Sequence, residues 1–77
     1  MKFYVIERVD DSWVLRPFGR HDALISGPTL KSAKEQAFER VREWAPCRIR
    51  VLGEVPEEWR LEEVDGEWEQ VEPEPDA

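Results

Sequence analysis

The longest periodic pattern in the chain lies between Thr29 and Pro46. Apolar residues recur there at intervals of three and four, which places them on one side of a helix; they are Leu30, Ala33, Ala37, Val41 and Trp44. Thr29 is a favourable capping residue, and Pro46 disfavours helical geometry at the residue before it. The pattern therefore predicts one amphipathic helix over about residues 29–45, packed on the domain through its apolar side.

Segments before this helix alternate between apolar and polar residues, as β-strands do. In residues 2–9 one face is half apolar, through Tyr4 and Ile6, and the other is clearly apolar, through Phe3, Val5 and Val9. Residues 13–18 form a second predicted strand, and the turn cluster at residues 10–12 joins it to the first. This order predicts an N-terminal hairpin.

One strand is predicted after the helix, and an optional third strand before it is left open. Residues 19–28 form a loop in which residues 23–25 could extend briefly before the Ser-Gly-Pro sequence that precedes Thr29. Residues 47–52 alternate cleanly, with Arg48 and Arg50 on the polar side and Cys47, Ile49 and Val51 on the apolar side. Gly53 ends this strand.

The region 54–72 allows two interpretations. Asp65-Gly66 is typical of a two-residue hairpin turn, and it would join strands at 59–64 and 67–71. That hairpin would put Trp59, Leu61 and Trp68 on one face, and Glu62, Glu67 and Glu69 on the other with Val64 and Val71. Alternatively, a short helix begins at Pro56 and runs over residues 56–64. We favour the hairpin.

Together these elements predict an α+β fold. An antiparallel sheet of four to five strands carries the helix of residues 29–45 on one face. Residues 1–72 form a single small domain. Residues 73–77 contain two prolines and two acids without a large apolar side chain, which predicts a disordered acidic tail.

Length and composition limit the cellular setting. A chain of 77 residues buries a marginal core, to which four Trp, three Phe and one Tyr contribute large apolar areas. Its single cysteine, Cys47, excludes an internal disulfide. The chain has no apolar run of the length that a signal peptide or a membrane span requires. We therefore expect a cytoplasmic protein that does not act at a membrane.

Charge is distributed unevenly along the chain. Residues 1–53 carry seven acidic and ten basic residues, a net charge of +3, whereas residues 54–77 carry eleven acidic residues and one arginine, a net charge of −10. Such asymmetry indicates that the chain binds a partner through opposite charges. The acidic part would be repelled by phosphates, which argues against direct nucleic-acid binding.

Candidate catalytic and metal-binding residues are few. His21 is the only histidine and adjoins Asp22 in a loop, a pattern more typical of a solvated pair than of a catalytic one. One Cys and one His do not complete a structural zinc site. Adjacent carboxylates such as Glu57 and Glu58 point to opposite sides of a strand, so they do not form an acid–base pair. We expect no catalytic residues, no metal and no cofactor, and hence no enzyme.

The chain resembles a family of small uncharacterised bacterial β-β-α-β-β domains over residues 3–53. The matching residues are Trp13–Val14, Thr29 with Ala33, and Val51 with Gly53. This resemblance implies the fold but no activity. In size and acidity the chain is also similar to phage-encoded inhibitors such as anti-CRISPR and anti-restriction proteins.

These observations predict a small non-enzymatic binding protein that acts by protein–protein interaction. Its acidic C-terminal strands would dock on a basic protein surface of the kind that holds nucleic acid, as an inhibitor does. The predicted contacts are Glu57, Glu58, Trp59, Glu62, Glu67, Trp68 and Glu69. The alternative is a structural domain that forms homodimers. If Arg48 and Arg50 pair with the acidic strands, part of the charge gradient is neutralised inside the molecule.

Overall fold

The computed structural model describes residues 2–72, so the predicted tail at 73–77 lies outside the described residues. Six strands and one helix follow one another along the chain. In order they are β1 (Lys2–Val9), β2 (Ser12–Pro17), β3 (Ile25–Gly27), α1 (Leu30–Val41), the 3₁₀ turn η1 (Arg42–Trp44), β4 (Cys47–Val51), β5 (Glu57–Leu61) and β6 (Glu69–Val71).

The strands form one mixed sheet in the order β3-β2-β1-β4-β5-β6. The α+β class is confirmed, but the prediction of a purely antiparallel sheet of four to five strands is wrong in two respects. Residues 2–72 contain six strands, since β3 and β6 both join the sheet as three-residue edges, and β1 and β4 are parallel. The parallel pair arises because α1 connects β3 to β4 by crossing over the sheet. Such a crossover brings β4 back beside β1, running in the same direction as β1.

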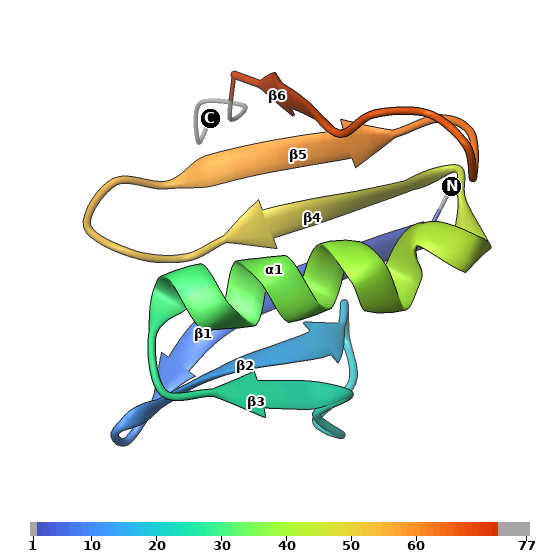
Figure 1. Cartoon of the computed structure of the whole chain (residues 1–77). Helices are drawn as coiled ribbons and strands as arrows, with labels where there is room; N and C mark the ends of the chain where they lie inside the picture. The colour runs from blue at the N-terminus through green and yellow to red at the C-terminus, as the bar shows by residue number, and fades with distance from the viewer. Residues whose placement is uncertain (1, 73–77) are drawn as a thin grey trace.

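Helix α1 crosses one face of the sheet (Figure 1). The side chain of Thr29 accepts a hydrogen bond from the Ser32 amide at 3.1 Å, which confirms the predicted cap. The α-helix ends at Val41 rather than near Ala45, and the chain continues through η1 before Ala45 turns to extended geometry. The buried core lies between α1 and the sheet; it contains Tyr4, Ile6, Leu15, Ala33, Ala37, Val41, Cys47, Ile49, Val51 and Leu61.

The half-apolar face of β1 is the one that packs against α1. Tyr4 is 5% exposed and Ile6 is fully buried, whereas Phe3 on the opposite face is 42% exposed. The reason is the register of the sheet. Ile6 lies beside Leu15 of β2, and Tyr4 lies beside Ile49 of β4, so apolar residues from three central strands adjoin on this face only. We call it the helix face, and we call the other the open face.

The C-terminal region is a pair of antiparallel strands, and the alternative of a helix at 56–64 is wrong. The predicted strand boundaries and the two-residue turn are also wrong. Strand β5 ends at Leu61, and the connection over residues 62–68 contains a turn in which the Gly66 amide donates to the Glu63 carbonyl at 2.9 Å. Glu62, Val64 and Glu67 therefore lie in a loop instead of sharing a strand face.

Candidate functional site: the acidic end of the sheet

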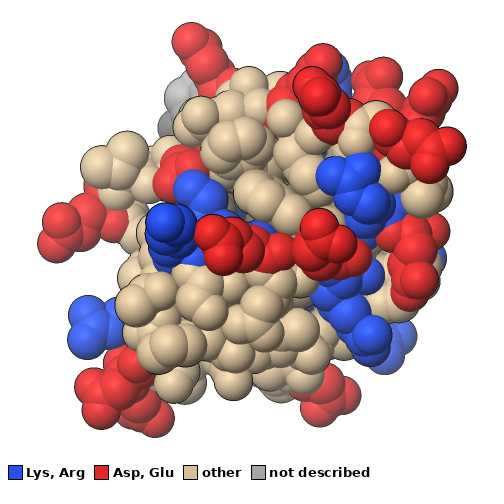
Figure 2. Space-filling view, in the orientation of Figure 1, with Lys and Arg blue, Asp and Glu red and all other residues tan. Residues whose placement is uncertain are grey.

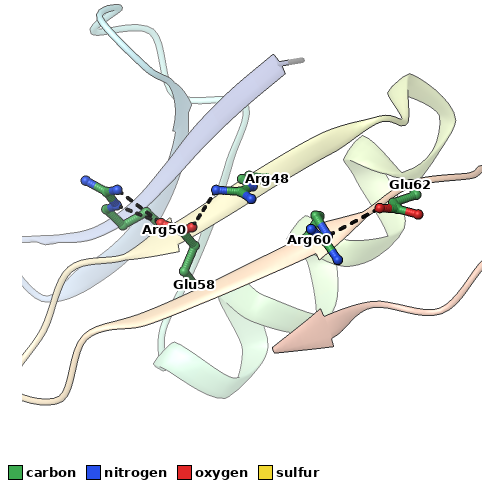
Figure 3. Close-up of polar contacts among 5 residues, drawn as sticks. All are labelled: Arg48, Arg50, Glu58, Arg60 and Glu62. Atoms are coloured by element: carbon green, nitrogen blue, oxygen red, sulfur yellow. Dashed lines mark hydrogen bonds and ion pairs between the residues drawn. The ribbon is translucent and has the colours of Figure 1, made fainter. Parts of the chain in front are cut away.

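One of the predicted contact residues, Glu58, is used inside the molecule. It projects from β5 onto the open face, yet its side chain is only 1% exposed. Arg48 Nη1 donates to Glu58 Oε2 at 3.0 Å, and Arg50 donates to Oε1 through Nε at 3.2 Å and Nη2 at 3.0 Å (Figure 3). Both arginines come from β4, where they stand beside this carboxylate. Glu58 is thus neutralised and has no surface to offer a partner.

Glu57 and Trp59 are also engaged internally, on the helix face. Lys34 Nζ of α1 donates to Glu57 Oε1 at 2.9 Å, and Trp59 Nε1 donates to the same oxygen at 3.1 Å. The hydrogen bond from Lys34 holds the pKa of Glu57 below its ordinary value, with a further contribution from Trp59. The Lys34 ammonium also lies 5.3 Å from the centre of the Trp59 ring.

Trp68 is a packing residue rather than an exposed anchor. Its ring stacks on Phe38 of α1 with centroids 4.8 Å apart, and Phe38 in turn meets the edge of Trp59 at 5.3 Å. Both tryptophans are partly buried against the core. Of the predicted contacts, therefore, only Glu62, Glu67 and Glu69 remain on the surface.

These three carboxylates gather with two that the sequence prediction omitted. Together they form what we call the acidic end, made of the exposed residues Glu62, Glu63, Asp65, Glu67 and Glu69. In Figure 2, acidic side chains crowd the upper right of the molecule, where Figure 1 places the connection between β5 and β6. All of the acidic end except Asp65 surrounds a shallow hollow of about 280 Å³ whose one basic lining residue is Arg60.

Arg60 offsets only part of this negative charge. Its Nη2 donates to Glu69 Oε2 at 3.2 Å, and its Nε forms an ion pair with Glu62 Oε1 at 3.6 Å, too long for a hydrogen bond (Figure 3). Both carboxylates are about two-thirds exposed, so these pairs are screened by water. The acidic end therefore keeps a strong net negative charge.

A residue from outside the acidic segment holds the loop in place. Arg42 Nη1, in η1, donates to the Val64 carbonyl at 2.9 Å and to the Gly66 carbonyl at 2.6 Å. Those two contacts tie residues 62–68 to the end of the helix. Because the loop is anchored at its backbone, its carboxylates are presented outward without being used to fix the loop.

The residues considered for chemistry lie elsewhere. Cys47 is fully buried, its thiol lies 3.7 Å from the Val41 carbonyl that it faces, and burial raises its pKa. His21 is exposed in the loop before β3. Among residues 2–72, no group of three His, Cys, Asp or Glu side chains is arranged to hold a metal ion. No helix in that range has the length and apolar character to cross a membrane.

The comparisons with known protein families, curated proteins and solved structures gave no significant match. The resemblance to β-β-α-β-β domains thus stays a prediction.

Glu63 and Asp65 were missed because the sequence placed both in a hairpin. The predicted strand over 59–64 assigned Glu63 by parity to the face opposite Glu62, and Asp65 was assigned to the two-residue turn. In a loop parity no longer applies, and both side chains point to solvent. The signal that could have found them is the density of acidic residues around Gly66.

Proposed function

We propose that this is a non-enzymatic binding protein that docks its acidic end on a basic surface of another protein. The observation that supports the proposal most directly is the group of five exposed carboxylates, four on the loop that Arg42 anchors and one, Glu69, at the start of β6, around a hollow that Arg60 lines. A dense charge of one sign attracts a basic partner over a distance of about a Debye length, roughly 8–10 Å, and orients it on approach.

The kind of partner follows from the same chemistry. Carboxylates presented in a group can occupy the positions that phosphates take on a nucleic-acid-binding protein, so the partner would lose access to its nucleic acid. Val64, 46% exposed at the tip of the loop, supplies an apolar contact among the charges in place of the tryptophans. Such an inhibitor would act in the cytoplasm, where the free thiol of Cys47 stays reduced.

The test compares two variants that remove equal charge from different places. One carries Glu62→Gln, Glu63→Gln and Glu67→Gln at the acidic end. The matched control carries Asp10→Asn, Asp11→Asn and Glu54→Gln, three exposed carboxylates in the turns after β1 and β4. Each protein is immobilised and used to capture partners from a nuclease-treated cell extract at low and high salt.

We expect the unaltered protein and the control to retain the same basic protein at low salt and to lose it at high salt. The acidic-end variant should fail to retain it, and added duplex DNA should displace it if its surface holds nucleic acid. The proposal fails if the acidic-end variant captures the same partner as the control, or if no basic protein binds at low salt.

A second candidate function is self-association through the open face. Phe18 is 70% exposed just after β2, and Phe3 beside it is 42% exposed. Together with Val5 and Arg50 they line a hollow of about 150 Å³. Light scattering at high protein concentration tests this candidate. We expect a dimer that Phe18→Ser dissociates, and a monomeric mass for the unaltered protein contradicts it.

A further inference from the structure

A third hollow, of about 470 Å³, lies where β1 begins and β2 ends. Its volume falls in the range of small-molecule sites. Three of its lining residues are polar, and the other four provide apolar walls. The lining residues are Lys2, Phe3, Tyr4, Pro17, Arg20, Leu24 and Trp44.

Tyr4 brings a hydroxyl to this hollow. Its side chain is 95% buried against the core, being 5% exposed, and its ring stacks on Trp44 with centroids 6.1 Å apart. No hydrogen bond joins its hydroxyl to another described residue, and the residue itself lines the hollow. A phenol without a partner among the described residues can donate to a ligand, and burial raises its pKa, which keeps the proton in place.

Basic side chains surround the same space. Lys2 and Arg20 line it, and neither forms an ion pair with another described residue. The Lys2 ammonium lies 5.8 Å from the centre of the Trp44 ring, and the Arg40 guanidinium lies 5.7 Å from it. Glu43 borders a separate hollow that Lys2 and Trp44 also line.

The loop that carries Arg20 is held by its backbone. The Arg20 amide donates to the Pro17 carbonyl at 3.1 Å, and its carbonyl accepts from Arg16 Nη1 at 3.2 Å. Arg16 is in turn fixed by two hydrogen bonds to Glu7 on the open face. The position of Arg20 is therefore set by contacts that leave its guanidinium available.

We propose that this hollow binds a small organic anion, in which a carboxylate or phosphate group is attached to an apolar ring. The oxyanion would accept hydrogen bonds from Lys2, Arg20 and the Tyr4 hydroxyl, and the ring would pack between Leu24 and Pro17. Two basic groups and a neutral phenol favour an anion, and the apolar walls favour a ligand larger than an inorganic ion. This proposal is independent of the acidic end.

The test is an NMR titration of the ¹⁵N-labelled full chain with phenyl phosphate and with benzoate, which distinguish a phosphate from a carboxylate. Two control probes are used: inorganic phosphate, which lacks the ring, and benzyl alcohol, which lacks the charge. We expect saturable shifts at the amides of residues 2–4, 20 and 24 and at the Trp44 indole. One of the two ring-bearing anions should bind at least about tenfold more tightly than both control probes.

Variants then locate the binding. Arg20→Ala, Lys2→Ala and Tyr4→Phe should each weaken binding by about fivefold or more, and Tyr4→Phe keeps the ring that packs in the core. Arg8→Ala and Lys31→Ala remove equivalent exposed charges away from the hollow and should leave affinity unchanged. Spectra without ligand show whether each variant is folded. If Tyr4→Phe is unfolded, the affinities of Arg20→Ala and Lys2→Ala decide whether the ligand binds in this hollow.

Three results would overturn the proposal. Shifts that spread over the surface without saturating would mean that no site is present. Inorganic phosphate that binds as tightly as phenyl phosphate and benzoate would indicate an adventitious anion only. Equal affinity in Arg20→Ala and Lys31→Ala would place the binding outside this hollow.

Discussion

The two faces of the sheet bury residues by different means. On the helix face, Ile6, Leu15 and Ile49 are covered by α1 and are fully buried in an ordinary apolar core. On the open face no helix of residues 2–72 is present (Figure 1), yet Val5 is 4% exposed and Glu58 is 1% exposed. Their cover comes from arginine side chains of the neighbouring strands. A small protein can thus seal the second side of a sheet with polar residues whose long stems lie over it.

Charge pairing differs between the faces in the same way. Glu57 and Glu58 are consecutive, so they point to opposite sides of β5. Glu57 is paired by Lys34 across the gap between sheet and helix, whereas Glu58 is paired by Arg48 and Arg50 within the sheet. The steep charge gradient along the sequence is therefore much reduced at the surface. Most of what survives lies at the acidic end, on the loop that follows β5 and at the start of β6.

The largest loss of stability is expected on the helix face. Ile49→Ala removes a fully buried side chain from the middle of β4, and it should lower the free energy of unfolding by about 2–5 kcal/mol. Urea denaturation measures the change. Val55→Ala, at a position that is 76% exposed, is the control and should change stability by less than about 0.5 kcal/mol. Similar losses at both positions would contradict the assignment of the core.

A smaller but distinct loss is expected at the buried carboxylate. Glu58→Gln weakens three hydrogen bonds and leaves two guanidinium groups without a counter-charge, so we expect a loss of about 2 kcal/mol. Arg48 and Arg50 are 24% and 40% exposed, and water limits the effect. Glu69→Gln, which alters an exposed pair with Arg60, should lose less than about 1 kcal/mol. Equal losses of stability in Glu58→Gln and Glu69→Gln would mean that the buried pairing of Glu58 with Arg48 and Arg50 contributes no more than an exposed ion pair.

The helix cap should contribute less again. Thr29→Ala removes the hydrogen bond to the Ser32 amide and should cost about 1 kcal/mol, whereas Thr29→Ser keeps the hydroxyl and should be nearly neutral. Thermal unfolding followed by circular dichroism measures both. If Ala and Ser behave alike, the hydroxyl does not cap α1.

The smallest effect is expected in the pH dependence of stability, which compares one glutamate on each face. Hydrogen bonds from Lys34 and Arg16 lower the pKa of Glu57 on the helix face and of Glu7 on the open face. The unfolded chain then binds more protons, so this stability is complete above the ordinary pKa of about 4.5 and is lost as pH falls further. Glu57→Gln and Glu7→Gln should each reduce the loss between neutral and acid pH, by less than about 1 kcal/mol. A pH profile unchanged in both variants would contradict these pairings.

Local pattern in the sequence was enough to predict most of the elements. The spacing from Leu30 to Val41 predicts α1 and its buried side, Thr29 predicts its start, and the alternation in residues 2–9 and 47–52 predicts β1 and β4. Each of these predictions depends on residues only a few positions apart. The backbone geometry of a helix or strand fixes how the side chains of such residues point. The sequence marks extended segments near β3 and β6, at residues 23–25 and 67–71, but both strands are only three residues long. So short a segment shows too little of a period to decide whether it joins the sheet, which left the predicted number at four to five.

Only the tertiary structure decided which surfaces are left for function. Whether β1 buries Tyr4 or Phe3 depends on its register against β2 and β4, and register joins residues more than 40 positions apart. Whether a glutamate is free depends on which arginine or lysine stands beside it, as Glu58 shows. Composition alone predicted an acidic C-terminal region. The pairing of strands neutralised part of it and left Glu62, Glu63, Asp65, Glu67 and Glu69 exposed, because charges are cancelled by neighbours in space and not by neighbours in sequence.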